Sequence, residues 1–178
     1  MPDLLAPTMR LHSAWRAAHE EWGPGTHEDG FGLLPEDDTS SIAGFTAWLR
    51  RLTEESSPAT HLGAGKVHCT YRWIVEDDQV LGGIALRHEL NQLLKEEGGH
   101  TGYGIRPSAR RRGLATWALG QMLIEATTLG LNRVLVVCAV DNTASARTIE
   151  RCGGVLADIH QSSRGPLRRY WIRSDRET

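Results

Sequence analysis

The chain has 178 residues, a length that suits one domain with a sizeable core and leaves little room for two complete domains. Its formal net charge of −2 gives no overall attraction to nucleic acid or to an anionic membrane, so we expect neither as a partner. The three cysteines lack C-x-x-C spacing, which argues against a disulfide framework and against a zinc site.

Hydropathy bears on where the protein resides. No apolar stretch approaches the roughly 20 residues that a bilayer span requires. The N-terminal segment also lacks a basic region followed by an apolar core, which is the pattern of a secretion signal. We therefore expect a cytoplasmic protein.

Two helices are expected in the N-terminal third of the chain. Residues 4–20 carry apolar side chains at mixed helical spacing. Residues 39–53 place four apolar side chains on one helical face, namely Ile42, Phe45, Leu49 and Leu52. The intervening "WGPGTHEDGFG" is rich in glycine and predicts a loop.

The segment after residue 66 has the pattern of a β-sheet. Residues 66–86 hold two runs of β-forming residues, and the "EDDQ" at 76–79 between them predicts a hairpin. A short helical turn is expected before Gly98 and Gly99, and residues 100–105 predict a further strand.

The rest of the chain alternates between helices and strands. Residues 113–129 have apolar side chains every three or four positions and are followed by Gly130, the pattern of a helix that ends there. Four more elements are expected: a buried strand at 133–140, a short helix capped by Asn142, and closing strands at 155–159 and 168–172. This order predicts a mixed α/β fold with one central sheet.

The stretch "RRRGLA" at 110–115 joins a predicted strand to a predicted helix. Backbone N–H groups at a helix N-terminus are unpaired and the helix dipole adds about half a positive charge, so this end of a helix attracts phosphate. Gly113 permits a positive φ and lets a diphosphate approach the backbone. Arg110, Arg111 and Arg112 add positive charge. A solvated basic turn is the alternative interpretation.

This loop resembles the [QR]-x-x-G-x-[GA] motif of the GNAT superfamily of acyl-CoA-dependent N-acyltransferases, with Arg110, Gly113 and Ala115 at its defined positions. The flanking order is similar too, from "GYGIRPSA" before the loop to "DNTASARTIERCGG" one helix and one strand later. The resemblance covers roughly residues 66–173. It implies a central mixed sheet with helices on both faces and two strands that splay apart at the cofactor site.

The resemblance also implies which residues bind acetyl-CoA. Loop amides would bind the pyrophosphate, and the pantetheine arm would lie between residues 100–105 and 133–140, where strand backbone hydrogen-bonds the arm and the thioester oxygen. Asn142 falls on the family's N-x-x-A asparagine, with Ser145 in place of the usual alanine, and a simple helix cap is the alternative. The residues so implied are Tyr103, Gly104, Ile105, Arg110, Arg111, Arg112, Gly113, Leu114, Ala115, Thr116, Asn142 and Ser145.

Acyl transfer to an amine requires a proton for the departing thiolate. Many members of the family have a tyrosine seven residues after the asparagine, and here that position is Ile149. Tyr103, Cys138, Ser145 or solvent could supply the proton instead, and Tyr103 is the candidate catalytic side chain.

A free alkyl amine is largely protonated at neutral pH, so the site must also remove a proton. His100 is the candidate base, because it begins the strand that would line the acceptor side and its ordinary pKa near 6.5 suits the task. The alternative is a histidine that satisfies a strand end or a loop carbonyl. Glu89 is the second candidate and His88 a weaker one. Cys138 is expected to be an inert strand thiol rather than a nucleophile.

The sequence therefore predicts one N-acetyltransferase domain over residues 1–178, with a helical acceptor-side portion at 1–60 and a sheet core at 66–173 that holds the acyl-CoA-binding motif. It would transfer an acetyl group from acetyl-CoA directly to a primary amine in a ternary complex, with no metal. The acceptor would be a small molecule or a peptide, and exposed edge strands would allow a homodimer. Two alternatives are a non-catalytic acyl-CoA sensor of the same fold and an interaction module with an empty basic turn.

Overall fold

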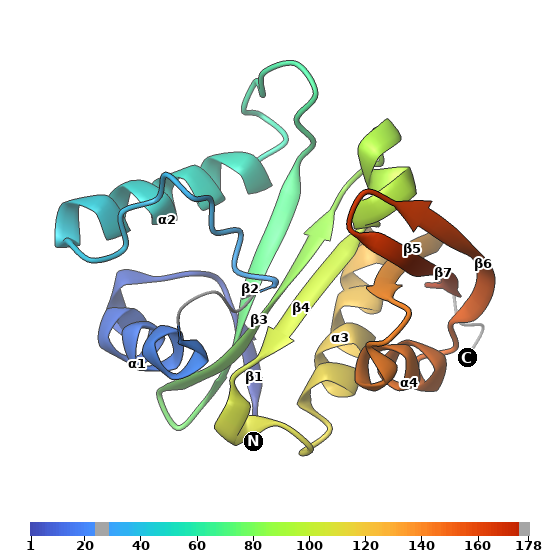
Figure 1. Ribbon diagram of the computed structural model, residues 1–178. Coiled ribbons are helices and arrows are strands. Elements are labelled where there is room, and N and C mark those ends of the chain that lie inside the picture. Colours follow the sequence, from blue (N-terminus) through green and yellow to red (C-terminus); the bar gives the residue numbers. More distant parts are fainter. Residues whose placement is uncertain (24–28, 175–178) are drawn as a thin grey trace.

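A computed structural model describes residues 1–23 and 29–174 and shows a seven-stranded mixed sheet between helices (Figure 1). The strands are β1 (Asp3–Leu5), β2 (Cys69–Glu76), β3 (Gln79–Arg87), β4 (Thr101–Ile105), β5 (Arg133–Ala139), β6 (Val155–Ser162) and β7 (Gly165–Arg173). The α-helices are α1 (His12–Trp22), α2 (Ile42–Ser56), α3 (Leu114–Thr128) and α4 (Thr143–Arg151). Short turns are η1 (Met9–Leu11), the π-helical η2 (Leu94–Gly98) and η3 (Pro107–Ala109). The described helices include none long and apolar enough to cross a membrane.

The predicted mixed α/β class is confirmed, with strand order β1-β2-β3-β4-β5-β7-β6. Each face of the sheet carries its own apolar core, because successive side chains of a strand point to opposite faces. Helices α1 and α2 cover one face with an aromatic cluster that includes Trp15, Phe45, Trp48 and Trp73, all at most 1% exposed. Helices α3 and α4 cover the other face. The sheet thus separates two compartments.

The N-terminal region differs from its sequence prediction. Residues 4–20 were expected to form one helix, but Asp3–Leu5 pairs with β2 as strand β1, and α1 begins only at His12. The first residues therefore belong to the edge of the sheet rather than to the helical layer. The hydrophobic spacing of the segment was helical only from Leu11 onward, where Trp15 and Ala18 are buried.

The predicted hairpin is confirmed and turns at two residues in the left-handed region, Asp77 at φ 49° and Asp78 at φ 58°. A two-residue turn of this kind matches the twist of the paired strands. Strand β4 then pairs with β3 over its whole length, from Leu86–Thr101 to Gly82–Ile105.

The neighbours β4 and β5 are parallel and are in register at a single described pair, Thr101 with Val136. Beyond this pair the two strands separate, whereas β5 stays paired with β7 from Arg133 to Ala139. The expected divergence of these strands is therefore present in the fold. It opens toward the end of β4, which leads through η3 to the N-terminus of α3.

The hairpin of β6 and β7 forms the other edge of the sheet. Strand β6 is exposed along most of its length, including the apolar Val155, Leu156 and Ile159. An exposed edge strand of this kind can pair with another chain. A homodimer stays a prediction.

The segment after residue 29 packs so closely on β3 that only glycine fits at Gly30. Its φ is +88°, and a Cβ atom there would lie 2.3 Å from the Gly83 carbonyl oxygen. We expect Gly30→Ala to lower the free energy of unfolding by roughly 2 kcal/mol or more, measured by urea denaturation. The control Gly63→Ala, where a Cβ meets nothing within 4 Å, should stay within about 0.5 kcal/mol of the wild type. Equal losses in both variants would contradict the close contact.

Candidate active site

The N-terminus of α3 has the geometry of an anion cradle. Gly113 adopts φ 78° and ψ 3° immediately before the helix, and no side chain caps the helix. From Arg111 onward in the described chain, the first backbone N–H with a backbone acceptor is that of Trp117. It donates to the Gly113 carbonyl at 3.0 Å. The backbone N–H groups from Arg111 to Thr116 are thus available, as expected for a helix N-terminus. A Cβ atom on Gly113 would meet nothing within 4 Å, so the space beside this residue is open.

The three arginines of the loop do different things. The Nε of Arg110 donates to the Ile105 carbonyl at 3.0 Å and so ties the loop to the end of β4. Arg112 forms an ion pair with Glu76. Arg111 is exposed and has φ 61°, an uncommon conformation for a residue with a side chain. Its positive charge is therefore the one most open to a ligand among the three.

A carboxylate on α1 anchors the segment before the loop. Glu21 accepts hydrogen bonds from the Ser108 backbone N–H at 2.5 Å and the Ser108 hydroxyl at 2.9 Å, and from the Arg106 guanidinium. Burial opposes ionisation, but these hydrogen bonds outweigh it and lower the pKa of Glu21. The cradle is consequently held from the opposite face of the sheet.

The open side of β4 presents backbone amides toward β5. In an antiparallel pair, hydrogen-bonded and non-bonded residue pairs alternate. Arg87 N–H donates to the His100 carbonyl and Arg106 N–H to the Leu81 carbonyl, so Gly102 and Gly104 also bond to β3. The N–H groups of Tyr103 and Ile105 therefore point into the divergence, where β5 is not in register to receive them.

Tyr103 bridges the gap between β4 and α4. Its hydroxyl lies 2.8 Å from the Ser145 hydroxyl, and the backbone N–H of Ser145 donates to the Asn142 side chain at 3.0 Å. Burial raises the pKa of Tyr103, so the phenol keeps its proton at neutral pH. Asn142 acts as the helix cap that the sequence offered as its alternative role. Ile149, where the family's tyrosine would be, is fully buried in the core.

Cys138 is a buried thiol of β5, 7% exposed. Burial raises its pKa, which disfavours the reactive thiolate. The position therefore agrees with an inert strand cysteine.

His100 holds β4 and β5 together just before they diverge. Its backbone N–H donates to the Leu135 carbonyl at 2.7 Å, and its Nδ1 accepts from the Leu135 N–H at 2.9 Å. This bond fixes the neutral tautomer with the proton on Nε2. Burial, aided by the positive charge of Arg87, lowers the pKa of His100 from 6.5 to about 4. An imidazole that is 5% exposed and already uses its lone pair is poorly placed as a base, so the geometry favours the alternative of a structural histidine.

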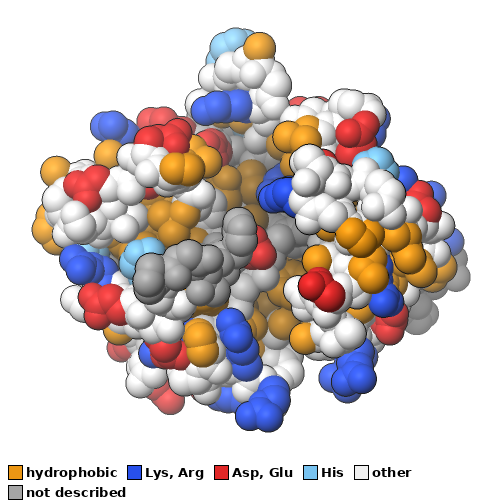
Figure 2. All heavy atoms as spheres, in the orientation of Figure 1, with side chains coloured by type: hydrophobic (Ala, Val, Ile, Leu, Met, Phe, Trp, Pro, Cys, Tyr) orange, Lys and Arg blue, Asp and Glu red, His pale blue; other side chains and the backbone are white. Residues whose placement is uncertain are grey.

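A cavity of about 330 Å³ lies on the α1–α2 face of the sheet, next to β4. Its wall comes from residues 29–34, α2, the start of β2, the end of β3, and Gly102 of β4. Figure 2 shows the molecule hollowed between the side of α2 and the side of the β6–β7 hairpin. The cavity reaches β4 from the face opposite to Tyr103, because Gly102 and Tyr103 point to opposite faces.

Ion pairs fix much of the cavity wall. Arg51 donates to Asp37 at 2.6 Å and to Glu55 at 3.0 Å, and Tyr71 donates its hydroxyl to the other oxygen of Glu55 at 2.7 Å. The predicted acceptor-side portion covered residues 1–60, of which 24–28 lie outside the described residues. Sequence analysis missed Arg51, Glu55 and Tyr71, because nothing in their local pattern marks residues that meet only across α2 and β2.

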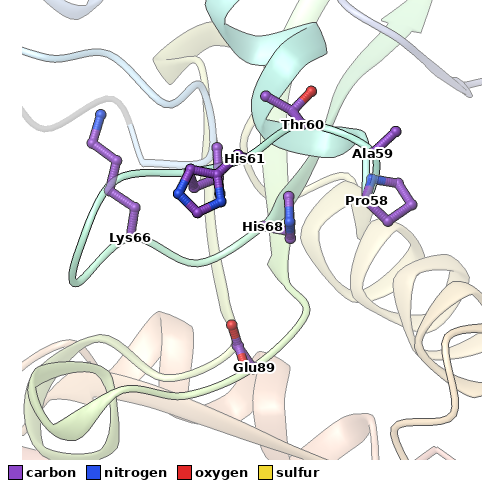
Figure 3. A pocket seen from close by; sticks show the side chains of 8 residues that line it. Pro58, Ala59, Thr60, His61, Lys66, His68 and Glu89 are labelled. Atoms are coloured by element: carbon purple, nitrogen blue, oxygen red, sulfur yellow. The ribbon is translucent and has the colours of Figure 1, made fainter.

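A second cavity of about 390 Å³, more open to solvent, lies next to the start of β2. Figure 3 shows His61 and Lys66 on the loop before β2, His68 next to that strand, and Glu89 on the segment after β3. Glu89, the second candidate base, faces this outer cavity. Among the residues described, no three His, Cys, Asp or Glu side chains are grouped to hold a metal ion. His88 lies nearby, with its Nε2 2.8 Å from the Thr70 hydroxyl.

The profile of the acetyltransferase (GNAT) domain family matches residues 6–155. The chain belongs to this family and is an acetyl-CoA-dependent acetyltransferase. The resemblance drawn from the Arg110–Gly113–Ala115 motif is thereby confirmed. No curated protein matches the chain in sequence.

Solved structures of the same fold agree with this assignment. RimJ from Mycobacterium smegmatis, in complex with CoA-disulfide, is 16% identical with a TM-score of 0.72, over 97% of this chain and 81% of that chain. YncA from Salmonella typhimurium, a putative acetyltransferase with its cofactor acetyl-CoA, is 14% identical with a TM-score of 0.64, over 99% and 96% of the chains. The Salmonella typhimurium enzyme that modifies the N-terminal serine of ribosomal protein L7/L12 is 13% identical with a TM-score of 0.69, over 97% and 94%. At these identities the likeness shows the fold.

The pH dependence of stability tests the structural role of His100. Because its pKa is lowered in the folded state, its contribution is present above pH 6.5 and is lost as the pH falls toward about 4. In His100→Asn the side-chain oxygen can still accept from Leu135, but it does not titrate. The free energy of unfolding of the wild type should therefore fall relative to this variant across that window, by on the order of 3 kcal/mol. Parallel curves, or a variant that folds but loses all turnover at neutral pH, would favour the role of base.

Proposed function

We propose that the protein is an N-acetyltransferase that transfers the acetyl group of acetyl-CoA directly to a primary amine within a ternary complex. One observation carries this proposal: neighbouring residues of β4 are accessible both from the divergence toward β5 and from the cavity on the α1–α2 face. Toward β5 the strand offers the Tyr103 and Ile105 amides, and on the α1–α2 face Gly102 borders the cavity. A donor in the divergence and an acceptor in the cavity would then meet across one strand, without an acyl-enzyme step.

The chain's own groups suit the donor. The amides of Arg111 to Thr116 would hold the diphosphate, with Arg111 beside them. The Tyr103 amide would hydrogen-bond the thioester oxygen and stabilise the negative charge that develops there, at no cost of reorganisation. Acetyl-CoA supplies the activated acetyl group. Open space beside Gly113 supports this fit.

Tyr103 is the proposed source of the proton for the thiolate. Its phenol is protonated at neutral pH and lies in the gap between β4 and α4, on the same strand as the amide that would bind the thioester oxygen. Cys138 and Ser145 are the other groups near this gap. The proton of the incoming amine would leave through water in the cavity, since the lone pair of His100 Nδ1 is occupied.

The acceptor is proposed to be a small amine that fits the cavity of about 330 Å³. Structures of this fold include enzymes for protein acceptors and for small-molecule acceptors. The Salmonella typhimurium enzyme modifies a protein N-terminus, and the Vibrio cholerae SpeG chimera is a spermidine N-acetyltransferase. A cytoplasmic location stays part of the proposal.

Two glycines of equal geometry test the cradle. Gly113 and Gly130 have φ of 78° and 79°, and a Cβ atom on either meets nothing within 4 Å. Both alanine variants should therefore lose similar stability, about 1 kcal/mol. Only Gly113→Ala should weaken acetyl-CoA binding, by about tenfold or more in calorimetry, because only its methyl group stands before the helix N-terminus. Equal affinities in the two variants would place the diphosphate elsewhere.

An acceptor screen separates enzyme from sensor. Purified protein with acetyl-CoA and a broad panel of amines should release free coenzyme A, measured with a thiol reagent. Tight acetyl-CoA binding without turnover on any amine would support the sensor instead. No rise in melting temperature with excess acetyl-CoA would support the interaction module.

Tyr103→Phe tests the proton donor. We expect kcat to fall by about 10- to 100-fold, because the thiolate loses its positioned acid, while the affinity for acetyl-CoA changes less than about threefold. Tyr170→Phe is the matched control, since that phenol is also buried but donates to Glu150 rather than meeting Ser145. A Tyr103→Phe enzyme with the wild-type kcat would assign the proton to solvent.

A further inference from the structure

The guanidinium of Arg87, at the end of β3, lines the cavity but has no part in the proposed function. Its Nη1 donates to the carbonyls of Gly98 and Gly99 at 3.3 and 3.1 Å, which caps the end of η2. In the described part of the chain no hydrogen bond is found for its Nε or Nη2, and no carboxylate pairs with it. One edge of the guanidinium is thus anchored, and the edge that binds carboxylates in a bidentate manner is available.

The other charges of the inner wall are largely compensated. Glu55 is neutralised by Arg51 and hydrogen-bonded by Tyr71, and Arg51 is also paired with Asp37. Arg87, in contrast, acts electrostatically on the groups around it, lowering the pKa of His100 and opposing the rise in that of Cys69. A ligand that reaches the inner wall would therefore meet the anchored guanidinium of Arg87, for which the described residues offer no carboxylate partner.

Arg87 also lies close to the proposed point of transfer. It faces the same side of β3 as Ala85, which is the partner of Gly102 in β4. Two residues of a strand span about 7 Å, a distance that a guanidinium and one carboxylate together can bridge. An anionic group bound by Arg87 would thus lie next to an amine positioned at Gly102.

We propose that the acceptor is a free α-amino acid whose carboxylate binds the Nε–Nη2 edge of Arg87 while its amine faces Gly102. This inference rests on the proposed function, because it assigns the acceptor of that same site. An α-amino acid carries its amine and carboxylate on one carbon, which matches the short separation of the two positions. Its side chain would extend into the remaining space of the cavity, toward α2 and residues 29–34.

Two further charges border the cavity, Asp29 and Lys66. Both are exposed. Lys66 adds positive charge near the outer cavity, which it also lines, and so supports an anionic acceptor. Asp29 would instead attract a second ammonium group, and it defines the competing class, a diamine or polyamine. The experiment has to separate these two classes.

Matched acceptors provide the test. Leucine, leucinamide and 3-methylbutylamine share a side chain, but only leucine carries a carboxylate, and equivalent sets can be built on alanine, methionine and phenylalanine. For the preferred side chain we expect kcat/KM to be about 10- to 100-fold higher for the acid than for its amide or amine. Spermidine and putrescine complete the panel as cationic acceptors.

Variants assign the preference to Arg87. Arg87→Lys keeps the positive charge and a donor for the Gly98 and Gly99 carbonyls but loses the bidentate edge. Arg87→Gln loses the positive charge as well as the bidentate edge. We expect the preference for the acid to fall about tenfold in Arg87→Lys and to disappear in Arg87→Gln, with turnover of 3-methylbutylamine retained. Arg50→Gln, an exposed arginine of α2, should keep the wild-type preference. Melting temperature and acetyl-CoA affinity show that each variant is folded.

The outcomes distinguish this inference from the proposed function. Coenzyme A release that favours amides, plain amines or polyamines would overturn the amino-acid acceptor and leave the N-acetyltransferase standing. A preference for acids that survives in Arg87→Gln would overturn the role of Arg87. Absence of turnover with every amine would remove the proposed function and the inference together.

Discussion

The site depends on where two parallel strands stop pairing. Strands β4 and β5 are joined at Thr101 and Val136, and His100 closes them from both its backbone and its ring onto Leu135. Beyond this point β5 remains hydrogen-bonded to β7. The divergence therefore leaves amides of β4 unpaired, and the far edge of the sheet stays intact. Unpaired amides inside a protein are costly unless a ligand or water receives them. The fold therefore stores a set of directed donors beside the helix N-terminus that would bind a diphosphate.

The two faces of the sheet divide the chemistry. On the α3–α4 face, the hydroxyls of Tyr103 and Ser145 join β4 to α4. On the α1–α2 face, the aromatic cluster around Trp48 and Trp73 supports α2, which carries Arg51 into the cavity wall. Glu21 crosses between the layers by anchoring Ser108. Gly102 leaves the cavity face of β4 open, since a larger side chain there would fill part of the cavity, whereas Gly104 makes room for the backbone of Asp29.

Local pattern was sufficient for most elements and for the cradle, because these depend on residues near in sequence. The helix Leu114–Thr128, its preceding Gly113 and the hairpin turn at Asp77 are all of this kind. Strand β1 was missed because its three residues gain their conformation from pairing with β2, about 70 positions away. The cavity wall and the bond from Leu135 to His100 likewise depend on contacts between distant segments. A histidine at a strand start looks the same in sequence whether its lone pair is free or occupied.

The site departs from the family's usual arrangement at Ile149, which replaces a tyrosine, but the phenol of Tyr103 lies close to the same helix. Many members of the family have a tyrosine at this position; here an isoleucine at 0% exposure packs in the core instead. Residues four apart lie on the same face of a helix, so Ser145 is the α4 position one turn before Ile149 on that face. Tyr103 reaches this position from the opposite wall, and its hydroxyl meets Ser145 at 2.8 Å. The phenol is thus carried by the same strand as the Tyr103 and Ile105 amides, so the proposed acid and the proposed amide donors would be held on one rigid element.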